Sequence, residues 1–374
     1  MAIEKVLVDQ FIQMSEKYPV FDVRSPGEFA HAHIPGAYSL PLFTDEERKV
    51  VGTTYKQQSR EAAIKTGLDF FGPRMKSVVE QVEGICNQFP YQDNHSARPQ
   101  VLVHCWRGGM RSAAIAWLLD LYGFKVTTLA GGYKKYRNFV LNLFTYPFAF
   151  RILGGYTGSG KTGVLKELKR FGEPMVDLEG IAHHKGSAFG AINEPPQPSQ
   201  EMFENKLAYQ LYFTVKPSFF EESTESSSVV NNPVWLEDES QRIGSVNIPQ
   251  QLWNTMRSAP VYFLDIPFEQ RLDHIVEGYG HLDKEQMLNA IVRIKKRLGG
   301  LETKTAVNFL IEDNNRECFR VLLTYYDKHY IKGLINRDNH EQLVTKITCS
   351  MVEAAGNARK IQNLKQFVSH TIAT

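Results

Sequence analysis

Two glycine-containing loops constrain the fold of this 374-residue chain more than any other feature. One follows the apolar run 101–103 and the other follows the apolar run 150–153, and a helical pattern begins after each loop. The repeated order of strand, loop and helix favours parallel sheets covered by helices. We therefore predict an α/β fold, with a parallel-sheet domain at 1–138, a linker at 139–148, and a second α/β domain at 149–374 that has a helical C-terminal region.

Apolar periodicity predicts the individual elements. Apolar positions at helical spacing predict a helix at 111–122, and the chain beyond Glu269 reads as helical. The acidic, serine-rich stretch 221–228 predicts a surface loop. Short apolar runs predict strands at 20–24, 101–103, 124–129, 150–153, 175–178, 234–236 and 261–266.

The composition excludes several classes of protein. Hydrophobic residues make up 43% of the chain, as in globular proteins, and the formal net charge of +2 does not by itself indicate a nucleic-acid partner. The cysteines (Cys86, Cys105, Cys318 and Cys349) have no C-x-x-C spacing, which argues against a zinc ribbon or a disulfide scaffold. The N-terminus lacks signal-peptide character, and the most apolar stretch is too short and interrupted to span a bilayer. We predict a cytoplasmic protein that does not interact with a membrane.

The first loop, which we call the cysteine loop, has the sequence HCWRGGMRS at residues 104–112. Cys105 lies between a strand end and a helix N-terminus, where the helix dipole and unpaired backbone N–H groups favour a thiolate. The two glycines of the cysteine loop let successive backbone N–H groups point inward and form an anion-binding nest. The two arginines of the loop add positive charge. These features disfavour a merely buried structural cysteine. The predicted catalytic residues are Cys105, Arg107 and Arg111.

The second loop is a P-loop with the sequence GYTGSGKT at residues 155–162. Its backbone N–H groups bind phosphate oxygens, Lys161 neutralises them, and the Thr162 hydroxyl can bind Mg²⁺. ATP or GTP is the default ligand, and the motif also fits another diphosphate ester. The predicted phosphate- or diphosphate-binding residues are Gly155, Gly158, Ser159, Gly160, Lys161 and Thr162.

An acidic run follows the apolar stretch 234–236 and is the natural partner of the P-loop. We name Glu237 and Asp238 as candidate metal ligands or supports of the metal site, with a solvated strand end as the equally weighted alternative. No metal beyond Mg²⁺ and no prosthetic group is predicted.

Residues upstream of the cysteine loop narrow its chemistry. DVRSPGEF at 22–29 and HIPGA at 33–37 resemble the rhodanese (sulfurtransferase) domain, and the resemblance covers about 1–137. In that family the cysteine carries sulfur or selenium. The pattern HC-x5-RS also fits cysteine-dependent phosphatases, so phosphatase chemistry stays an alternative.

The order of further motifs joins the two halves of the chain. These motifs are VGTTYKQQ at 51–58, GGYTGSGKT at 154–162, DLEG at 177–180, HKGSAFG at 184–190, LEDESQRIG at 236–244 and IKKRLG at 294–299. Together they resemble bacterial tRNA 2-selenouridine synthases over nearly the full length. Lys185 departs from the arginine that we expect in the family, and a lysine cannot make the same bidentate phosphate contact.

The resemblance implies a two-step modification of 2-thiouridine at the wobble position of the tRNAs for Lys, Glu and Gln. It implies selenophosphate as the selenium donor, and S-geranyl-2-thiouridine, made from geranyl diphosphate, as the intermediate. An enzyme that supplies selenophosphate is then a candidate partner. On this interpretation the P-loop holds the diphosphate of geranyl diphosphate, and Cys105 serves the selenation step.

A tRNA substrate requires a basic surface. The candidate tRNA-binding residues are Lys134, Lys135, Arg137, Arg293, Lys295, Lys296 and Arg297. Solvated charged faces are the commoner interpretation of such runs.

Three other functions stay open at this point. One is a rhodanese-fold cysteine phosphatase or a sulfurtransferase coupled to a P-loop NTPase. Another is an adaptor gated by nucleotide binding, although the intact cysteine loop disfavours it. A plain thiosulfate sulfurtransferase would leave the P-loop without a role.

Overall fold

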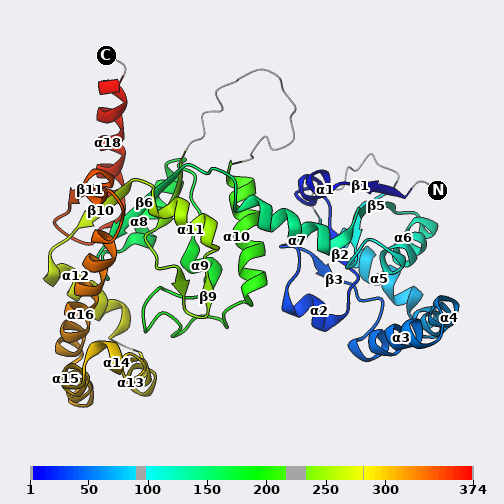
Figure 1. Cartoon of the computed structure of the whole chain (residues 1–374), viewed down its shortest axis with the longest axis horizontal. Helices are drawn as coiled ribbons and strands as arrows, with labels where there is room; N and C mark the ends of the chain where they lie inside the picture. Colours follow the sequence, from blue (N-terminus) through cyan, green and yellow to red (C-terminus); the bar gives the residue numbers. More distant parts are fainter. Residues whose placement is uncertain (1–2, 90–97, 216–232, 281, 373–374) are drawn as a thin grey trace. The chain divides into compact units, whose positions relative to one another are not determined.

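The computed structural model describes residues 3–89, 98–215, 233–280 and 282–372 (Figure 1). The chain divides into two compact units. The first extends to Leu143 and also includes Glu204–Tyr209, and the second takes most of the chain from Phe144 onward. The predicted surface loop at 221–228 lies outside the described residues.

The first unit is built on a parallel sheet. Its strands are β1 (Glu4–Val6), β2 (Val20–Asp22), β3 (Tyr38–Ser39), β4 (Gln100–His104) and β5 (Lys125–Leu129). Among the described residues their spatial order is β1-β5-β4-β2-β3, and each pair is parallel. The helices are α1 (Val8–Ser15), α2 (Pro26–His31), α3 (Asp45–Gln57), α4 (Arg60–Phe71), α5 (Met75–Cys86), α6 (Met110–Tyr122) and α7 (Gly132–Leu143).

The central strand β4 shows why this sheet is parallel and covered on both faces. Val101, Leu102 and Val103 are completely buried, so side chains on both faces of the strand are excluded from water. One hydrophobic cluster packs the sheet against α5 and α6. The strand therefore delivers the cysteine loop from a rigid core.

A buried ion pair explains the DVR sequence at the end of β2. The Nη2 of Arg24 donates to the Oδ2 of Asp22 at 2.6 Å and to the carbonyl oxygen of Ala32 at 2.7 Å. The guanidinium carbon of Arg24 lies 3.7 Å from the centroid of the Tyr133 ring. Loss of either charged partner would leave the other charge buried and unpaired. We assign these residues to the scaffold that supports the cysteine loop.

The second unit contains another parallel sheet. Its strands are β6 (Phe150–Gly155), β7 (Val234–Glu237), β10 (Val261–Asp265) and β11 (Val344–Thr348), and a separate antiparallel hairpin is formed by β8 (Arg242–Ile243) and β9 (Val246–Asn247). Among the described residues the order is β11-β10-β6-β7, so that β6 is an inner strand.

Helices make up much of the remainder of this unit (Figure 1). They are α8 (Lys161–Arg170), α9 (Leu178–Ala182), α11 (Gln250–Arg257), α12 (Phe268–Tyr279), α13 (Lys284–Arg293), α14 (Lys295–Leu298), α15 (Gly300–Ile311), α16 (Asn315–Ile335), α17 (His340–Leu343) and α18 (Ala354–Ile372). Helix α10 (Gln200–Val215) contributes Glu204–Tyr209 to the first unit and its two ends to the second. The predicted α/β fold with a helical C-terminal region is confirmed.

Some predicted elements differ from the structure. In the predicted strand 175–178, Met175 makes only an isolated bridge with Trp235, and Leu178 begins α9 because the Oδ1 of Asp177 accepts a hydrogen bond from the Gly180 N–H at 2.6 Å. The helical prediction beyond Glu269 missed β11, an edge strand in which only Ile347 is buried. The predicted linker 139–148 is helical through Leu143, since α7 buries Val140 and Leu143.

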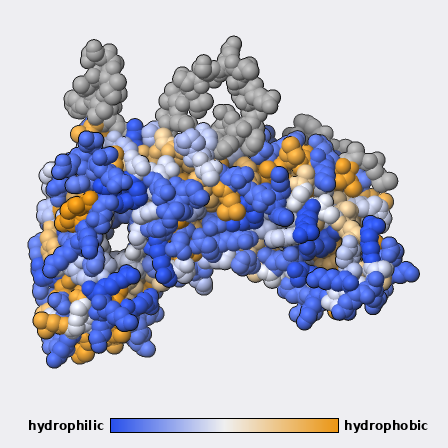
Figure 2. Space-filling view, in the orientation of Figure 1, coloured by the Kyte–Doolittle hydropathy of each residue, from blue (hydrophilic) through white to orange (hydrophobic). Residues whose placement is uncertain are grey.

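No helix among the described residues is long and apolar enough to cross a membrane. Figure 2 shows a mostly hydrophilic visible surface, with hydrophobic side chains in small groups.

Candidate functional site

The cysteine loop connects β4 to α6 in the first unit. The left-handed backbone of Gly108 and Gly132 (φ 63° and 59°) lets the start of α7 approach the loop closely. A Cβ atom on Gly132 would lie 2.3 Å from the carbonyl oxygen of Cys105. The Tyr133 N–H donates to that same oxygen at 2.8 Å. The loop is therefore fixed by α7 as well as by its own strand and helix.

The environment of Cys105 favours the thiolate. Burial of the side chain, which is 3% exposed, raises the pKa of the thiol, but hydrogen bonds outweigh this effect and lower the pKa below its ordinary value. The contributing groups are the Ser112 hydroxyl, whose Oγ lies 3.3 Å from the Cys105 Sγ and 3.0 Å from the Gly109 carbonyl oxygen, and the backbone N–H groups of Gly109, Ser112 and Arg107. The contribution of the Ser112 hydroxyl was not predicted from the sequence, although its position in the first turn of α6 is a usable indication.

The two predicted arginines of the loop differ in their surroundings. The side chain of Arg107 is exposed, and its backbone N–H is the group that acts on Cys105. The Nη1 of Arg111 donates to the Oε2 of Glu28 at 2.8 Å, and the Nε of Arg48 lies 2.9 Å from the same oxygen. In this arrangement the thiolate is stabilised mainly by N–H groups and a hydroxyl, and the catalytic roles of the arginine side chains stay predictions.

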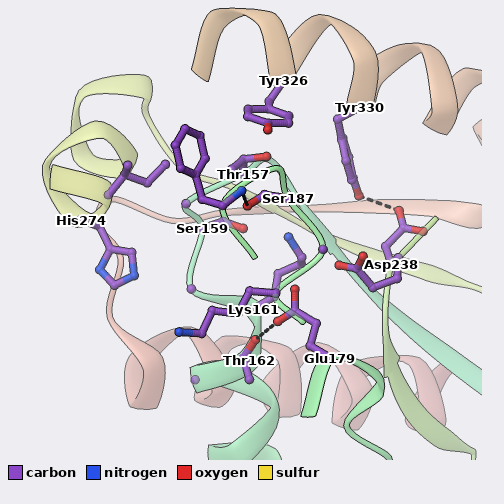
Figure 3. Close-up of a pocket in the computed structure, with 18 of the residues that line it drawn as sticks. Thr157, Ser159, Lys161, Thr162, Glu179, Ser187, Asp238, His274, Tyr326 and Tyr330 are labelled. Atoms are coloured by element: carbon purple, nitrogen blue, oxygen red, sulfur yellow. Dashed lines mark hydrogen bonds between the residues drawn. The ribbon is translucent and has the colours of Figure 1, made fainter. Parts of the chain in front are cut away.

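The P-loop connects β6 to α8 in the second unit and lines a cavity of about 910 Å³ (Figure 3). Gly158 has a left-handed backbone (φ 82°), and a Cβ atom there would lie 2.8 Å from the Cδ1 of Ile275. The Nζ of Lys161 donates to the carbonyl oxygen of Gly155 at 3.1 Å. The Ser159 Oγ is buried and has no hydrogen-bond partner among the described residues. Because buried polar atoms are normally hydrogen-bonded, this hydroxyl is expected to bind a ligand oxygen or a water.

Glu179 and Glu239 are the carboxylates associated with the P-loop lysine and threonine. The Thr162 hydroxyl donates to the Oε2 of Glu179 at 2.9 Å. Desolvation and the nearby charge of Glu179 raise the pKa of Glu239 well above its ordinary value, although the charge of Lys161 opposes the shift. This donor set fits Mg²⁺ held jointly with phosphate oxygens. The described residues contain no group of three or more His, Cys, Asp or Glu side chains that could hold a metal on their own.

The two carboxylates that the sequence singled out have other partners. Glu237 is completely buried, and its Oε2 accepts a hydrogen bond from the Leu178 N–H at the start of α9 (3.0 Å). Asp238 lines the cavity, but its Oδ2 accepts from the Tyr330 hydroxyl at 2.6 Å and its Oδ1 pairs with Arg337. Their placement therefore favours scaffold roles. Glu179 was overlooked although it belongs to the DLEG motif.

Apolar side chains line the cavity beside the P-loop. They are Phe189, Ile275, Tyr279, Phe319, Leu322, Leu323 and Tyr326, which come from a loop, α12 and α16. The rings of Phe189, Tyr279 and Phe319 pack on one another with centroid distances of 5.9, 6.4 and 6.5 Å. The cavity thus combines a phosphate-binding loop with an extended apolar surface.

Helix α16 is hydrogen-bonded directly to the P-loop. In Figure 3, Tyr326 and Tyr330 point from this helix toward the loop. The Tyr330 hydroxyl accepts from the Gly155 N–H at 3.0 Å. Arg271, which is 2% exposed, donates to the Thr157 carbonyl oxygen at 3.0 Å and pairs with Asp327 of α16 at 2.7 Å. The apolar lining and the phosphate-binding loop consequently form one rigid site.

The candidate tRNA-binding residues lie in two places. Lys134 and Lys135 are exposed at the start of α7, whereas Arg137 is half-buried and pairs with Glu204 at 2.5 Å. The second cluster is exposed on α13 and α14 and consists of Arg293, Lys295, Lys296 and Arg297. Burial lowers the pKa of the cavity residue His184, and the charge of Arg293 lowers it further, so Arg293 lies within electrostatic reach of the cavity. Lys185 pairs with Glu194 at 3.0 Å.

The described geometry predicts the pH dependence of Cys105 alkylation. A thiol with a lowered pKa ionises at lower pH, so the midpoint of the alkylation profile should lie below that of an ordinary cysteine thiol in an unfolded peptide. Ser112→Ala removes one hydrogen bond to the thiolate and should raise that midpoint. The measurement is the rate of iodoacetamide labelling at Cys105, followed by peptide mass spectrometry. Ser77→Ala, at an exposed serine of α5, is the matched control, and an unchanged midpoint in Ser112→Ala would contradict this account.

Comparisons with known proteins agree with this arrangement. A family model described as "tRNA 2-selenouridine synthase AAA domain" matches residues 148–360, and one described as "Rhodanese-like domain" matches residues 7–139. The chain is 37% identical over 268 residues to the tRNA 2-selenouridine synthase of Nitrosomonas europaea and 36% identical over 265 residues to that of Nitrosomonas eutropha. It is 33% identical over 351 residues to that of Aeromonas salmonicida.

The alignments differ in extent. Each Nitrosomonas alignment covers 70% of this chain, which spans 63% of the length of those relatives. The Aeromonas alignment covers 85% of this chain and 88% of that relative. The family resemblance predicted from the motifs is thereby confirmed.

Proposed function

Because the chain belongs to the tRNA 2-selenouridine synthase family, we propose that it replaces the C2 sulfur of a tRNA wobble 2-thiouridine with selenium. The tRNAs are those for Lys, Glu and Gln, selenophosphate supplies the selenium, and geranyl diphosphate supplies an S-geranyl intermediate. A selenophosphate-supplying enzyme is the implied partner. The reaction is that of a transferase, and its site of action is the cytoplasm.

The proposed transfer of the geranyl group is supported by one observation: the P-loop is continuous with the apolar lining of the cavity. Ile275 packs against Gly158 of the P-loop, so an apolar chain attached to a bound diphosphate would meet apolar side chains at once. Burial is worth about 0.8 kcal/mol per methylene, which amounts to several kcal/mol for a ten-carbon chain. Lys161 and the N–H groups of the P-loop would neutralise the departing diphosphate. The unpartnered Ser159 Oγ would gain a phosphate oxygen.

The chemistry is a pair of substitutions. In the first, the C2 sulfur attacks C1 of the geranyl group, the carbon–oxygen bond breaks, diphosphate leaves with the electron pair, and the N3 proton passes to water. The alkylated base is more electrophilic at C2. In the second, water cleaves the phosphorus–selenium bond of selenophosphate and gives phosphate and hydrogen selenide. The selenium adds at C2, one proton of hydrogen selenide returns to N3, and geranylthiol leaves with the other.

We propose that the cysteine loop serves the second substitution, in which selenium is added to the base. Its inward N–H groups suit the phosphate oxygens of selenophosphate, and a thiolate at Cys105 provides a soft nucleophile beside them. The fully buried scaffold of β4 and the Asp22–Arg24 pair would hold this loop in one geometry.

The P-loop assignment predicts that Lys161→Ala weakens geranyl diphosphate binding roughly 10- to 150-fold, because a charge-assisted contact is worth about 1.5–3 kcal/mol. Isothermal titration calorimetry measures the affinity. Lys169→Ala, an exposed lysine on the same helix, should bind as the parent does. The assignment would be contradicted if Lys161→Ala bound geranyl diphosphate as tightly as the parent protein. It would also be contradicted if the parent protein bound ATP but not geranyl diphosphate.

The cysteine assignment predicts that Cys105→Ala still geranylates a 2-thiouridine anticodon stem-loop but forms no selenouridine from the pre-geranylated RNA. Nucleoside mass spectrometry after selenophosphate addition gives both yields. Cys86→Ala, at another buried cysteine of this unit, is the control. Normal selenouridine output from Cys105→Ala would show that the thiol is dispensable, and turnover of an aryl phosphate at Cys105 would favour the phosphatase alternative.

A further inference from the structure

The P-loop cavity has two parts of different chemistry, and the proposed prenyl group accounts for only one. Along α16 the cavity residues from Phe319 to Tyr326 are hydrophobic or aromatic, and those from His329 onward are the mixed set His329, Tyr330, Gly333 and Leu334. Phe319 and Gly333 are fourteen residues apart, which separates them by about 21 Å along a helix. The two parts therefore lie at different places in the cavity.

The second part, which we call the Trp253 arm, is completed by α11 and by the segment after β7. Trp253 and Arg257 line it from α11, and the Nη2 of Arg257 donates to the Gly333 carbonyl oxygen at 3.0 Å. The guanidinium carbon of Arg257 lies 5.7 Å from the centroid of the Trp253 ring. Ser240 is exposed, and because its hydroxyl donates to the Arg242 carbonyl oxygen at 2.8 Å it can offer a ligand only an acceptor oxygen. Asp238 is held in place by Tyr330 and Arg337.

An aromatic ring, a guanidinium and a hydroxyl around a half-open space are typical of sites that take an unstacked nucleobase. Bases of single-stranded loops stack on tryptophan and arginine side chains and hydrogen-bond through their edges. Enzymes that modify a base take it out of its stack into such a pocket. Trp253 is half-buried, so part of its ring surface is available to a ligand.

We propose that the Trp253 arm receives the target pyrimidine of the RNA substrate, stacked on Trp253 and contacted by Arg257. This inference rests on the proposed function, because it needs an RNA substrate and a prenyl diphosphate in the same cavity. The prenyl chain lies in the apolar part, the diphosphate lies on the P-loop, and the base enters from the opposite side. Its C2 sulfur then faces the carbon from which diphosphate departs.

The test uses the full chain and an anticodon stem-loop that carries 2-thiouridine. Trp253→Ala should bind this RNA about 5- to 150-fold more weakly, as expected for the loss of one stacked base. Trp253→Phe should restore most of the affinity, because phenylalanine keeps an aromatic face. RNA should quench the tryptophan fluorescence of the parent protein, and the part of this quenching that comes from Trp253 should vanish in Trp253→Phe. Trp117→Phe, at an exposed tryptophan of α6, is the control.

Geranyl diphosphate calorimetry on each variant separates the possible failures. Unchanged affinity for geranyl diphosphate together with weakened RNA binding supports the Trp253 arm. RNA binding and quenching that do not depend on Trp253 overturn the Trp253 arm and leave the proposed function standing. A parent protein that binds geranyl diphosphate but not the RNA overturns both the RNA substrate and this arm.

Discussion

The hydrogen bond from the Gly155 N–H to the Tyr330 hydroxyl is the contact on which the second unit's site depends. It joins the first residue of the P-loop to α16, the helix that supplies much of the apolar lining. The same hydroxyl donates to Asp238, which Arg337 also holds. Because Tyr330 is fully engaged on both sides, the phosphate-binding loop and the cavity lining are fixed relative to each other. Such preorganisation lets a site stabilise a leaving group without paying for reorganisation during the reaction.

The two anion-binding loops use the same backbone geometry for different purposes. Each follows a buried parallel strand and precedes a helix, so that N–H groups converge where negative charge must be held. In the first unit the converging groups lower the pKa of Cys105 and favour a nucleophile. In the second unit Lys161 and the carboxylates beside it suit a phosphate group with a metal ion. The proposed reaction, a substitution at sulfur followed by delivery of selenium, would use both loops.

Local sequence predicted the parts of this structure that local interactions determine. The strands before both loops and the helices after them were predicted because a buried apolar run, a glycine turn and a helical pattern lie together in the chain. The orientation of the carboxylates could not be predicted, since Asp238 is held by Tyr330 and Arg337, which lie 92 and 99 residues further on. Edge strand β11 was missed because a single buried residue gives no periodic pattern. The face of α16 that lines the cavity likewise depends on tertiary contacts.

The central claim is that both sites act in sequence on one RNA base. The most direct measurement is mass spectrometry of nucleosides from a 2-thiouridine anticodon stem-loop incubated with the purified full chain, geranyl diphosphate and selenophosphate. The account predicts S-geranyl-2-thiouridine when selenophosphate is omitted and 2-selenouridine when both co-substrates are present. Selenouridine formed equally well without geranyl diphosphate, or an unmodified base under every condition, would contradict it.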